Sequence, residues 1–389
     1  MTRKIACIVS TIIFISILLQ TTSLAAVKED ELPLEINAKS ALLMDSATGK
    51  ILYEKNADEK LPVASIVKIM TLLIIFEAID NDHIKLKDKV IISERASGMG
   101  GSQVFLDQGA EHSVEELLKS IIIASANDAS VAMAEKIAGT EEIFVQKMNE
   151  KAASLGMKNT NFVNCTGLPV ENQYTTARDV AIMSRELLKH PEFFKWSTIW
   201  IDYLYHSNDR KTILTNTNRL IRFYDGADGI KTGSTNEAKY CLSATAKRGG
   251  MRLISVILAA PTTQVRFSEA QKLMDYGFAN FQSLRLIKAN ERIKKDIRVT
   301  GGRQNQLNVV AEKELNILVS KGDTKGIEKE YHLPDVIKAP VKMGEKLGEI
   351  IFKKDSKEVG RVAVVADREI GAAGFLDNVS KILANWIRK

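Results

Sequence analysis

One apolar run, residues 69–76, constrains this chain most, because it follows Ser65-Ile66-Val67-Lys68. Pro62 stands just before this stretch, and proline suits the entrance of a helix but not its interior. The sequence therefore predicts a largely buried helix with Ser65 in its first turn. Ser65 and Lys68 are three residues apart, so they share one helical face.

This spacing suits a nucleophile and its base. A serine hydroxyl attacks only when a neighbouring group takes its proton, and a lysine amine can do so only when it is neutral. Burial among apolar side chains near the positive end of a helix would lower the pKa of Lys68. The pattern alone also fits a capping serine and a solvated lysine, so further motifs must decide between the two.

The amino-terminal segment is typical of a secretory signal. Arg3 and Lys4 precede an apolar run over residues 5–19, and Ser23-Leu24-Ala25 supplies small residues for cleavage. The run is too short for a stable membrane-spanning helix. We expect residues 1–25 to be a signal peptide removed near Ala25, and the functional chain to work outside the cytoplasm. A retained amino-terminal anchor is the alternative.

Composition excludes several classes of function. The 389 residues suffice for two or three domains, and the net charge of +6 is not gathered into a basic stripe, which argues against nucleic-acid binding. The five histidines show no ligand spacing, so we expect no catalytic metal and no cofactor. We interpret Cys165 and Cys241 as buried free thiols, although one disulfide between them stays open.

The element pattern predicts an α/β (α+β) domain over residues 35–285. A strand pair is expected within residues 37–54, followed by a helical middle and then by strands near residues 230–233, 240–246 and 252–260. Gly249-Gly250 joins the last two strands and signals a tight hairpin. A closing helix is expected over residues 267–281.

The carboxyl-terminal part differs in composition. Residues 287–370 alternate short β-prone runs with charged turns, which predicts a separate small all-β domain. Residues 374–389 have helical periodicity, with Trp386 on a broad apolar face and basic residues around the other. We interpret this amphipathic tail as a membrane-interface helix. A last helix docked on the β domain is the alternative.

Two further motifs carry polar groups suited to catalysis. Ser125-Ala126-Asn127 lies at a predicted helix–helix turn, where the hydroxyl can relay a proton and the amide can hold a peptide carbonyl or Lys68. Lys231-Thr232-Gly233 lies on the first late strand, where the lysine offers a positive charge and the glycine allows close approach of an extended peptide. Helix capping and a surface lysine are the alternatives.

The order Ser-x-x-Lys, Ser-x-Asn, Lys-Thr-Gly is far more specific than any one motif. With these motifs, and with stretches such as Asp228-Gly229-Ile230-Lys231-Thr232-Gly233 and Leu273-Met274-Asp275-Tyr276-Gly277-Phe278, the chain resembles D-alanyl-D-alanine carboxypeptidases from about residue 35 onwards. These are low-molecular-weight penicillin-binding proteins. The resemblance implies a transpeptidase/β-lactamase-like catalytic domain, a small β-rich domain and an amphipathic anchor.

The resemblance also implies a role for each motif residue. Ser65 would attack the D-Ala-D-Ala carbonyl, Lys68 would act as its base, and Ser125 would pass a proton to the leaving amine. The implied substrate-binding residues are Asn127, Lys231, Thr232, Gly233, Ser234 and Arg266. Among these, Ser234 would complete an oxyanion hole with the backbone of Ser65, and Arg266 would hold the terminal carboxylate.

The implied partners are peptidoglycan pentapeptide stems, β-lactam antibiotics and the outer face of the cytoplasmic membrane, to which the tail would attach the enzyme peripherally. Ser234 stands where relatives often have histidine, and Lys239 puts a bulky charge near the cleft. Two alternatives stay open. One is a secreted class A-like β-lactamase, which would prefer Ser-Asp-Asn. The other is a non-catalytic β-lactam or cell-wall sensor.

Overall fold

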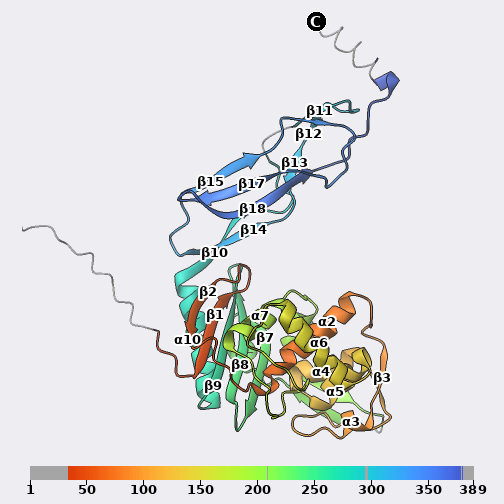
Figure 1. Ribbon diagram of the computed structural model, residues 1–389, viewed down its shortest axis with the longest axis vertical. Coiled ribbons are helices and arrows are strands. Elements are labelled where there is room, and N and C mark those ends of the chain that lie inside the picture. The colour runs from red at the N-terminus through yellow and green to blue at the C-terminus, as the bar shows by residue number, and fades with distance from the viewer. Residues whose placement is uncertain (1–33, 208, 294–296, 378, 380–389) are drawn as a thin grey trace, which may run out of the picture. The chain divides into compact units, whose positions relative to one another are not determined.

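The computed structural model describes residues 34–207, 209–293, 297–377 and 379 (Figure 1). The predicted signal peptide and most of the predicted carboxyl-terminal helix lie outside these residues. Among the described residues, no helix has both the length and the apolar character needed to cross a membrane.

The first domain is built on one antiparallel sheet with the order β2-β1-β9-β8-β7. The predicted hairpins are confirmed, and Gly249 and Gly250 have φ of 52° and 84°, the positive values that a tight two-residue turn needs. Strand β1 pairs with β9, so the two ends of the domain meet inside the sheet. The bounds are β1 Ser40–Asp45, β2 Ile51–Lys55, β7 Ala227–Thr235, β8 Lys239–Arg248 and β9 Met251–Ala260.

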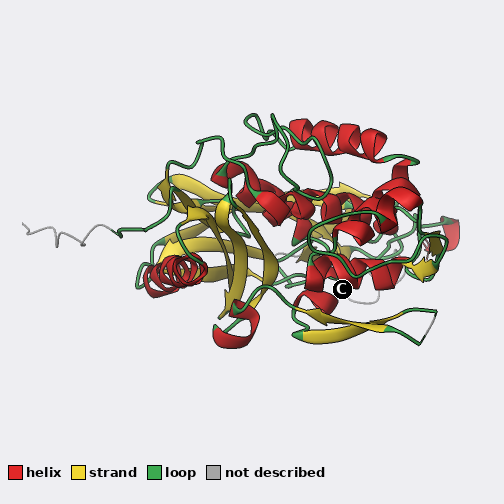
Figure 2. Ribbon diagram, turned by 90° about the horizontal axis from the view of Figure 1, so that it is seen from below, coloured by secondary structure: helices red, strands yellow, loops and turns green. Residues whose placement is uncertain are grey.

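Helices cover both faces of this sheet (Figure 2). Helix α10 packs on one face, where Gly277 lets it approach Leu253 and Leu43 closely. The helical middle covers the other face. The longer helices are α2 Lys68–Asp80, α4 Val114–Ala124, α5 Asn127–Ala138, α6 Glu141–Ser154, α7 Ala177–Leu187 and α10 Thr263–Asn280. The shorter ones are α3 Glu94–Ser97, α8 Phe193–Ser197 and α9 Leu220–Phe223.

Two helix starts differ from the sequence prediction. Ser65 lies in a 3₁₀ turn, η1 Ala64–Val67, which leads into α2, because Ala64 has a left-handed φ of 50° that a regular helix cannot include. Helix α10 begins before Phe267, because the Thr262 hydroxyl accepts a hydrogen bond from Val265 N and caps it.

Residues 281–370 form short β-sheets around two apolar clusters, which include Ile350 and Phe352 in one and Val299 and Leu307 in the other. The sequence did not indicate β10, β11, β15 and β16, because they are charged or follow directly on other elements. The strands are β10 Phe281–Ile287, β11 Ile297–Thr300, β12 Gln306–Leu307, β13 Val309–Ala311, β14 Leu315–Ser320, β15 Ile327–His332, β16 Val336–Lys338, β17 Lys346–Lys354 and β18 Lys357–Ala366.

Two small two-stranded sheets complete the first domain. Strands β3 Lys89–Ile91 and β4 Glu111–Ser113 pair beside α4, whose start carries the predicted capping box of Ser113 and Glu116. Strands β5 Ile201–Tyr205 and β6 Lys211–Thr215 form the second pair. The residues of the candidate site lie at the start of α2, at the turn between α4 and α5, and on β7.

Candidate active site

Ser65 and Lys68 face each other at the start of α2. The Nζ–Oγ distance is 3.2 Å, and Lys68 is fully buried. Lys68 Nζ also donates to Asn127 Oδ1 and to the carbonyl of Thr166, each at 2.6 Å. The amine therefore touches groups from three separate parts of the chain, and its side chain is held in one position.

Burial governs the protonation of both lysines in the site. Burial lowers the pKa of Lys68 to about 7, against the attraction of Cys165 and Asp128. Lys231 is only 1% exposed, and burial, followed by repulsion from Lys68 and Arg266, lowers its pKa well below the ordinary value. The surroundings of Lys231 thus oppose the positive charge that its residue type alone would supply.

Ser125 and Asn127 lie at the turn between α4 and α5. Ser125 ends α4 in a left-handed conformation, φ 64°, which turns its hydroxyl into the interior. Among the described residues, no group hydrogen-bonds to Ser125 Oγ, although the side chain is buried. Asn127 Nδ2 donates to Gly100 O at 2.7 Å, which fixes the amide with its oxygen towards Lys68.

Strand β7 is an edge strand of the five-stranded sheet and carries Lys231, Thr232, Gly233 and Ser234. A Cβ at Gly233 would lie 2.6 Å from Val63 O and 3.1 Å from Ser65 N. The sequence predicted that the missing side chain of Gly233 makes room for a substrate backbone. In the structure, it makes room for the chain's own backbone next to Ser65. Thr232 Oγ1 donates to Thr217 Oγ1 at 2.7 Å, and Ser234 is exposed.

Arg266 lies in the first turns of α10, directly behind β7. Its Nη1 donates at 3.3 Å to the carbonyls of Gly233 and Cys241, and its guanidinium lies over the rings of Tyr240 and Phe267. Burial lowers its pKa to about 10, so it stays charged at neutral pH. The fold thus brings every predicted site residue to β7, to the helix start behind it, or to the turns that face it.

Comparison with known proteins agrees with this geometry. The D-alanyl-D-alanine carboxypeptidase family matches residues 25–262, and the penicillin-binding protein 5 C-terminal domain matches residues 281–372. The chain belongs to the D-alanyl-D-alanine carboxypeptidase family. It is 46% identical to carboxypeptidase DacF of Bacillus subtilis, with 90% of each chain covered. It is 36% identical to carboxypeptidase DacC of Escherichia coli, with 92% of this chain and 90% of the relative covered.

A solved structure has a similar fold. Penicillin-binding protein 5 from Haemophilus influenzae is 34% identical, covers 87% of this chain and 98% of its own, and has a TM-score of 0.70. The predicted fold class and the predicted serine D-Ala-D-Ala carboxypeptidase activity are thereby confirmed. The family assignment favours this activity over the β-lactamase and sensor alternatives.

The candidate site also includes residues to which the sequence analysis gave no role in the site. Thr166 supplies the carbonyl for Lys68, and Cys165 supplies one for the Thr71 hydroxyl at 2.7 Å. Asn164 Oδ1 shapes this turn by accepting from Gly167 N at 2.7 Å. The Asn-x-x-Gly spacing signals a turn, but nothing local to it indicates that the turn reaches α2.

Behind this turn, Glu141 links two further groups. Its Oε1 accepts from Cys165 N at 3.0 Å, and its Oε2 accepts from Arg95 Nη2 at 2.5 Å. Cys165 and Cys241 are free and buried, as predicted. In the described part of the chain, no group of three or more histidine, cysteine or acidic side chains is arranged to hold a metal ion.

Proposed function

We propose that Ser65 is the nucleophile of this carboxypeptidase and that Lys68 is its base. One observation carries the proposal. A neutral lysine amine has two N–H groups and one lone pair, and Asn127 Oδ1 and Thr166 O lie where they accept the two N–H groups. The lone pair is left for the Ser65 hydroxyl at 3.2 Å.

In acylation, the Ser65 proton passes to Lys68 and Oγ bonds to the carbonyl carbon of the penultimate D-alanine. The backbone N–H groups of Ser65 and Ser234 stabilise the oxyanion, a contribution of about 3 kcal/mol in comparable sites. The carbon–nitrogen bond then breaks, and the leaving D-alanine amine takes its proton from Lys68 through Ser125. Water hydrolyses the ester and restores Ser65.

The free Ser125 hydroxyl supports this relay. A buried hydroxyl usually has a partner, and a missing one costs free energy. Ser125 Oγ has none among the described residues. The hydroxyl can therefore turn towards the leaving amine without first breaking a hydrogen bond.

We infer that Lys231, Thr232 and Arg266 form the site for the terminal carboxylate of the substrate. A carboxylate beside Lys231 would raise the pKa of this lysine, so binding would favour the charged form of the amine, which burial alone disfavours. Arg266 supplies a second cation behind the same strand. Asn127 would use its remaining N–H to orient the peptide.

The experiment is Ser65→Ala, assayed for penicillin labelling and for D-alanine release from a muramyl pentapeptide. We expect both to be abolished, because peptidoglycan stems and β-lactams would acylate the same oxygen. Ser268→Ala, an exposed hydroxyl on α10, is the matched control and should behave as wild type. Wild-type labelling or release in Ser65→Ala would exclude Ser65 as the nucleophile.

We further propose the organisation of the whole chain. Residues 1–25 would be a signal peptide, residues 35–285 the catalytic domain, residues 287–370 a separate β domain and residues 374–389 a helix at the membrane interface. The enzyme would then work outside the cytoplasm, on the outer face of the membrane. Phe375 and Leu376, the first apolar residues of the tail, are 82% and 79% exposed, which supports an apolar face available to lipid.

A further inference from the structure

Strands β5 and β6 form a two-stranded sheet with an exposed apolar face. Paired side chains of an antiparallel sheet lie on the same face. Tyr203, Tyr205 and Ile213 on this face are 41%, 66% and 58% exposed. An exposed apolar patch commonly marks a binding surface. We call the following six residues the outer face: Ile201, Tyr203, Tyr205, Lys211, Ile213 and Thr215.

The other face of this sheet holds the outer face in place. Leu204 and Leu214 are buried in the apolar core, and both strands contact α4. Lys119 of α4 forms an ion pair with Asp202 at 2.8 Å. Because the sheet is already ordered, a ligand on the outer face would bind without the cost of ordering it.

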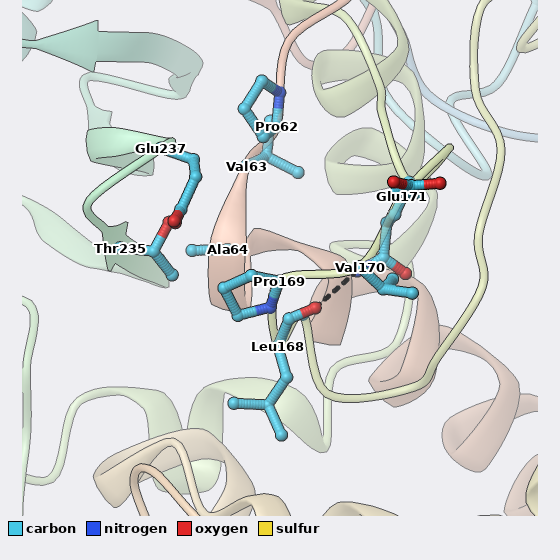
Figure 3. Close-up of a pocket in the computed structure, with 11 residues that line it drawn as sticks. Pro62, Val63, Ala64, Leu168, Pro169, Val170, Glu171, Thr235 and Glu237 are labelled. Carbon is cyan, nitrogen blue, oxygen red and sulfur yellow. Dashed lines mark hydrogen bonds between the residues drawn. The ribbon is translucent and has the colours of Figure 1, made fainter.

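The outer face adjoins the proposed active site on the side of the terminal carboxylate. The cavity in Figure 3, next to the turn that carries Ser65, belongs to that site and lies at the Thr235 end of β7. Earlier on β7, Thr232 donates to Thr217, which follows β6 by two residues. The outer face therefore begins close to the residues that would bind the terminal carboxylate.

The size of the outer face argues against a folded protein as its partner. Each strand has five residues and spans about 13 Å. A stable protein interface needs about 800 Å² on each partner, several times the area of two such strands. A narrow, extended polymer fits these dimensions better.

The side chains of the outer face define the chemistry of this polymer. The rings of Tyr203 and Tyr205 lie 6.5 Å apart, inclined at 39°. The sugars of a β-linked glycan have apolar C–H faces, which pack on the electron-rich faces of aromatic rings. Their hydroxyl and acetamido groups can bond to the tyrosine hydroxyls.

One charged residue, Lys211, belongs to the outer face. Its Nζ lies 5.0 Å from the centre of the Tyr203 ring. A cation at this place would attract the carboxylates of peptide stems attached to a glycan. The charge of the outer face therefore complements an anionic polymer.

We infer that the outer face binds a glycan strand of peptidoglycan, with sugars packed on Tyr203 and Tyr205. The inference rests on the proposed carboxylate site at Lys231 and Thr232. A stem that reaches this site points its free end away from its own glycan strand. The strand on the outer face is therefore a neighbouring one, and it holds the enzyme on the polymer.

The first test measures binding of a hexamer of β-1,4-linked N-acetylglucosamine, which has no peptide stem. We expect the full-length protein to bind it, and Tyr203→Ser combined with Tyr205→Ser to bind about tenfold more weakly, because two ring contacts are lost. Tyr331→Ser, which removes an exposed tyrosine of β15, is the matched control and should bind as wild type.

The second test measures D-alanine release from two substrates. One is isolated peptidoglycan, and the other is the soluble peptide acetyl-Lys-D-Ala-D-Ala. The double tyrosine variant should release D-alanine from peptidoglycan about fivefold more slowly than wild type. Its kcat/KM for the soluble peptide should be unchanged, because neither tyrosine belongs to the proposed catalytic site.

Three results would overturn the inference. One is a wild-type protein that does not bind the hexamer, or a double variant that binds it equally well. Another is an equal loss of activity on both substrates. The third is a wild-type dimer that the double variant converts to a monomer, since the face would then bind a second copy of the chain.

Failure of the proposed function would be seen separately. Ser65→Ala should lose D-alanine release from both substrates and still bind the hexamer. Release that persists in Ser65→Ala would exclude the proposed nucleophile without affecting glycan binding by the outer face.

Discussion

The buried Lys68 destabilises the fold at neutral pH, but the same burial lowers its pKa, as the proposed chemistry requires. Its pKa is 10.5 in the unfolded chain and about 7 when buried, so between these values the unfolded state binds a proton that the folded state does not. The contribution of Lys68 to stability therefore rises from about pH 7 to about pH 10.5. The same burial brings the pKa of Lys68 close to physiological pH, so a substantial fraction of the amine is neutral there.

This protonation predicts the pH dependence of acylation. Below about pH 7 Lys68 carries a proton, so the rate of benzylpenicillin acylation should fall about tenfold per pH unit, and it should level off above pH 7. Lys68→Arg, which stays charged, should be inactive throughout. Acylation rates measured from pH 5 to pH 9 check this, and a flat wild-type profile would contradict it.

Glu141 is a positioning residue in this geometry. It holds Cys165 N and Arg95, and thereby the turn that gives Thr166 O to Lys68. Glu141→Ala should slow acylation about tenfold and move the midpoint of the pH profile upward, because a looser turn admits water to the amine.

Glu141→Gln should recover most of the rate, because its amide oxygen can still accept from Cys165 N. Glu142→Ala, which removes an exposed neighbouring carboxylate on the same helix, is the control. If Glu141→Ala lowers the melting temperature but leaves the midpoint of the pH profile unchanged, Glu141 has a structural role only.

At the scale of elements, the site depends on two backbone segments packed closely against η1. Gly233 lets β7 approach Val63 and Ser65. Gly167 lets the turn that contains Thr166 approach Ala64. A Cβ at Gly167 would lie 2.0 Å from Ala64 O, too close for any contact. Larger residues at either position would push Ser65 out of line with Lys68.

This packing predicts the effect of Gly167→Ala. Gly167 has φ of 81° and Gly156 has φ of 76°, but only Gly167 has atoms within 4 Å of the added Cβ. Both alanines should cost about 1 kcal/mol in backbone strain. Gly167→Ala should in addition lower the acylation rate tenfold or more, while Gly156→Ala should not. Thermal unfolding measures the stability of the two variants, and penicillin labelling measures their acylation rates. Equal labelling rates would contradict the prediction.

At the scale of the whole molecule, the tail and the catalytic domain should be separable. Deleting residues 374–389 removes the predicted amphipathic face around Trp386 and no residue of the proposed site. The truncated protein should keep its D-alanine release in solution and lose its association with anionic vesicles. Flotation with vesicles measures this, and a truncated protein that still floats would disprove the anchor.

The sequence by itself determined the features that depend on neighbours along the chain. The buried helix after Pro62, the hairpin at Gly249-Gly250 and the capping box at Ser113 follow from local periodicity, φ preferences and caps. The order of the three motifs indicated the proposed catalytic residues for the same reason, since each motif is a short local pattern.

The tertiary structure alone decided how these residues meet. Thr166 accepts from Lys68 across 98 residues of sequence, and no local pattern specifies such a contact. Burial of Lys231 and the close approach of Gly233 to Val63 likewise arise only when β7 packs on η1. A pKa depends on surroundings in space, so the neutral lysine that the mechanism needs is a property of the folded protein.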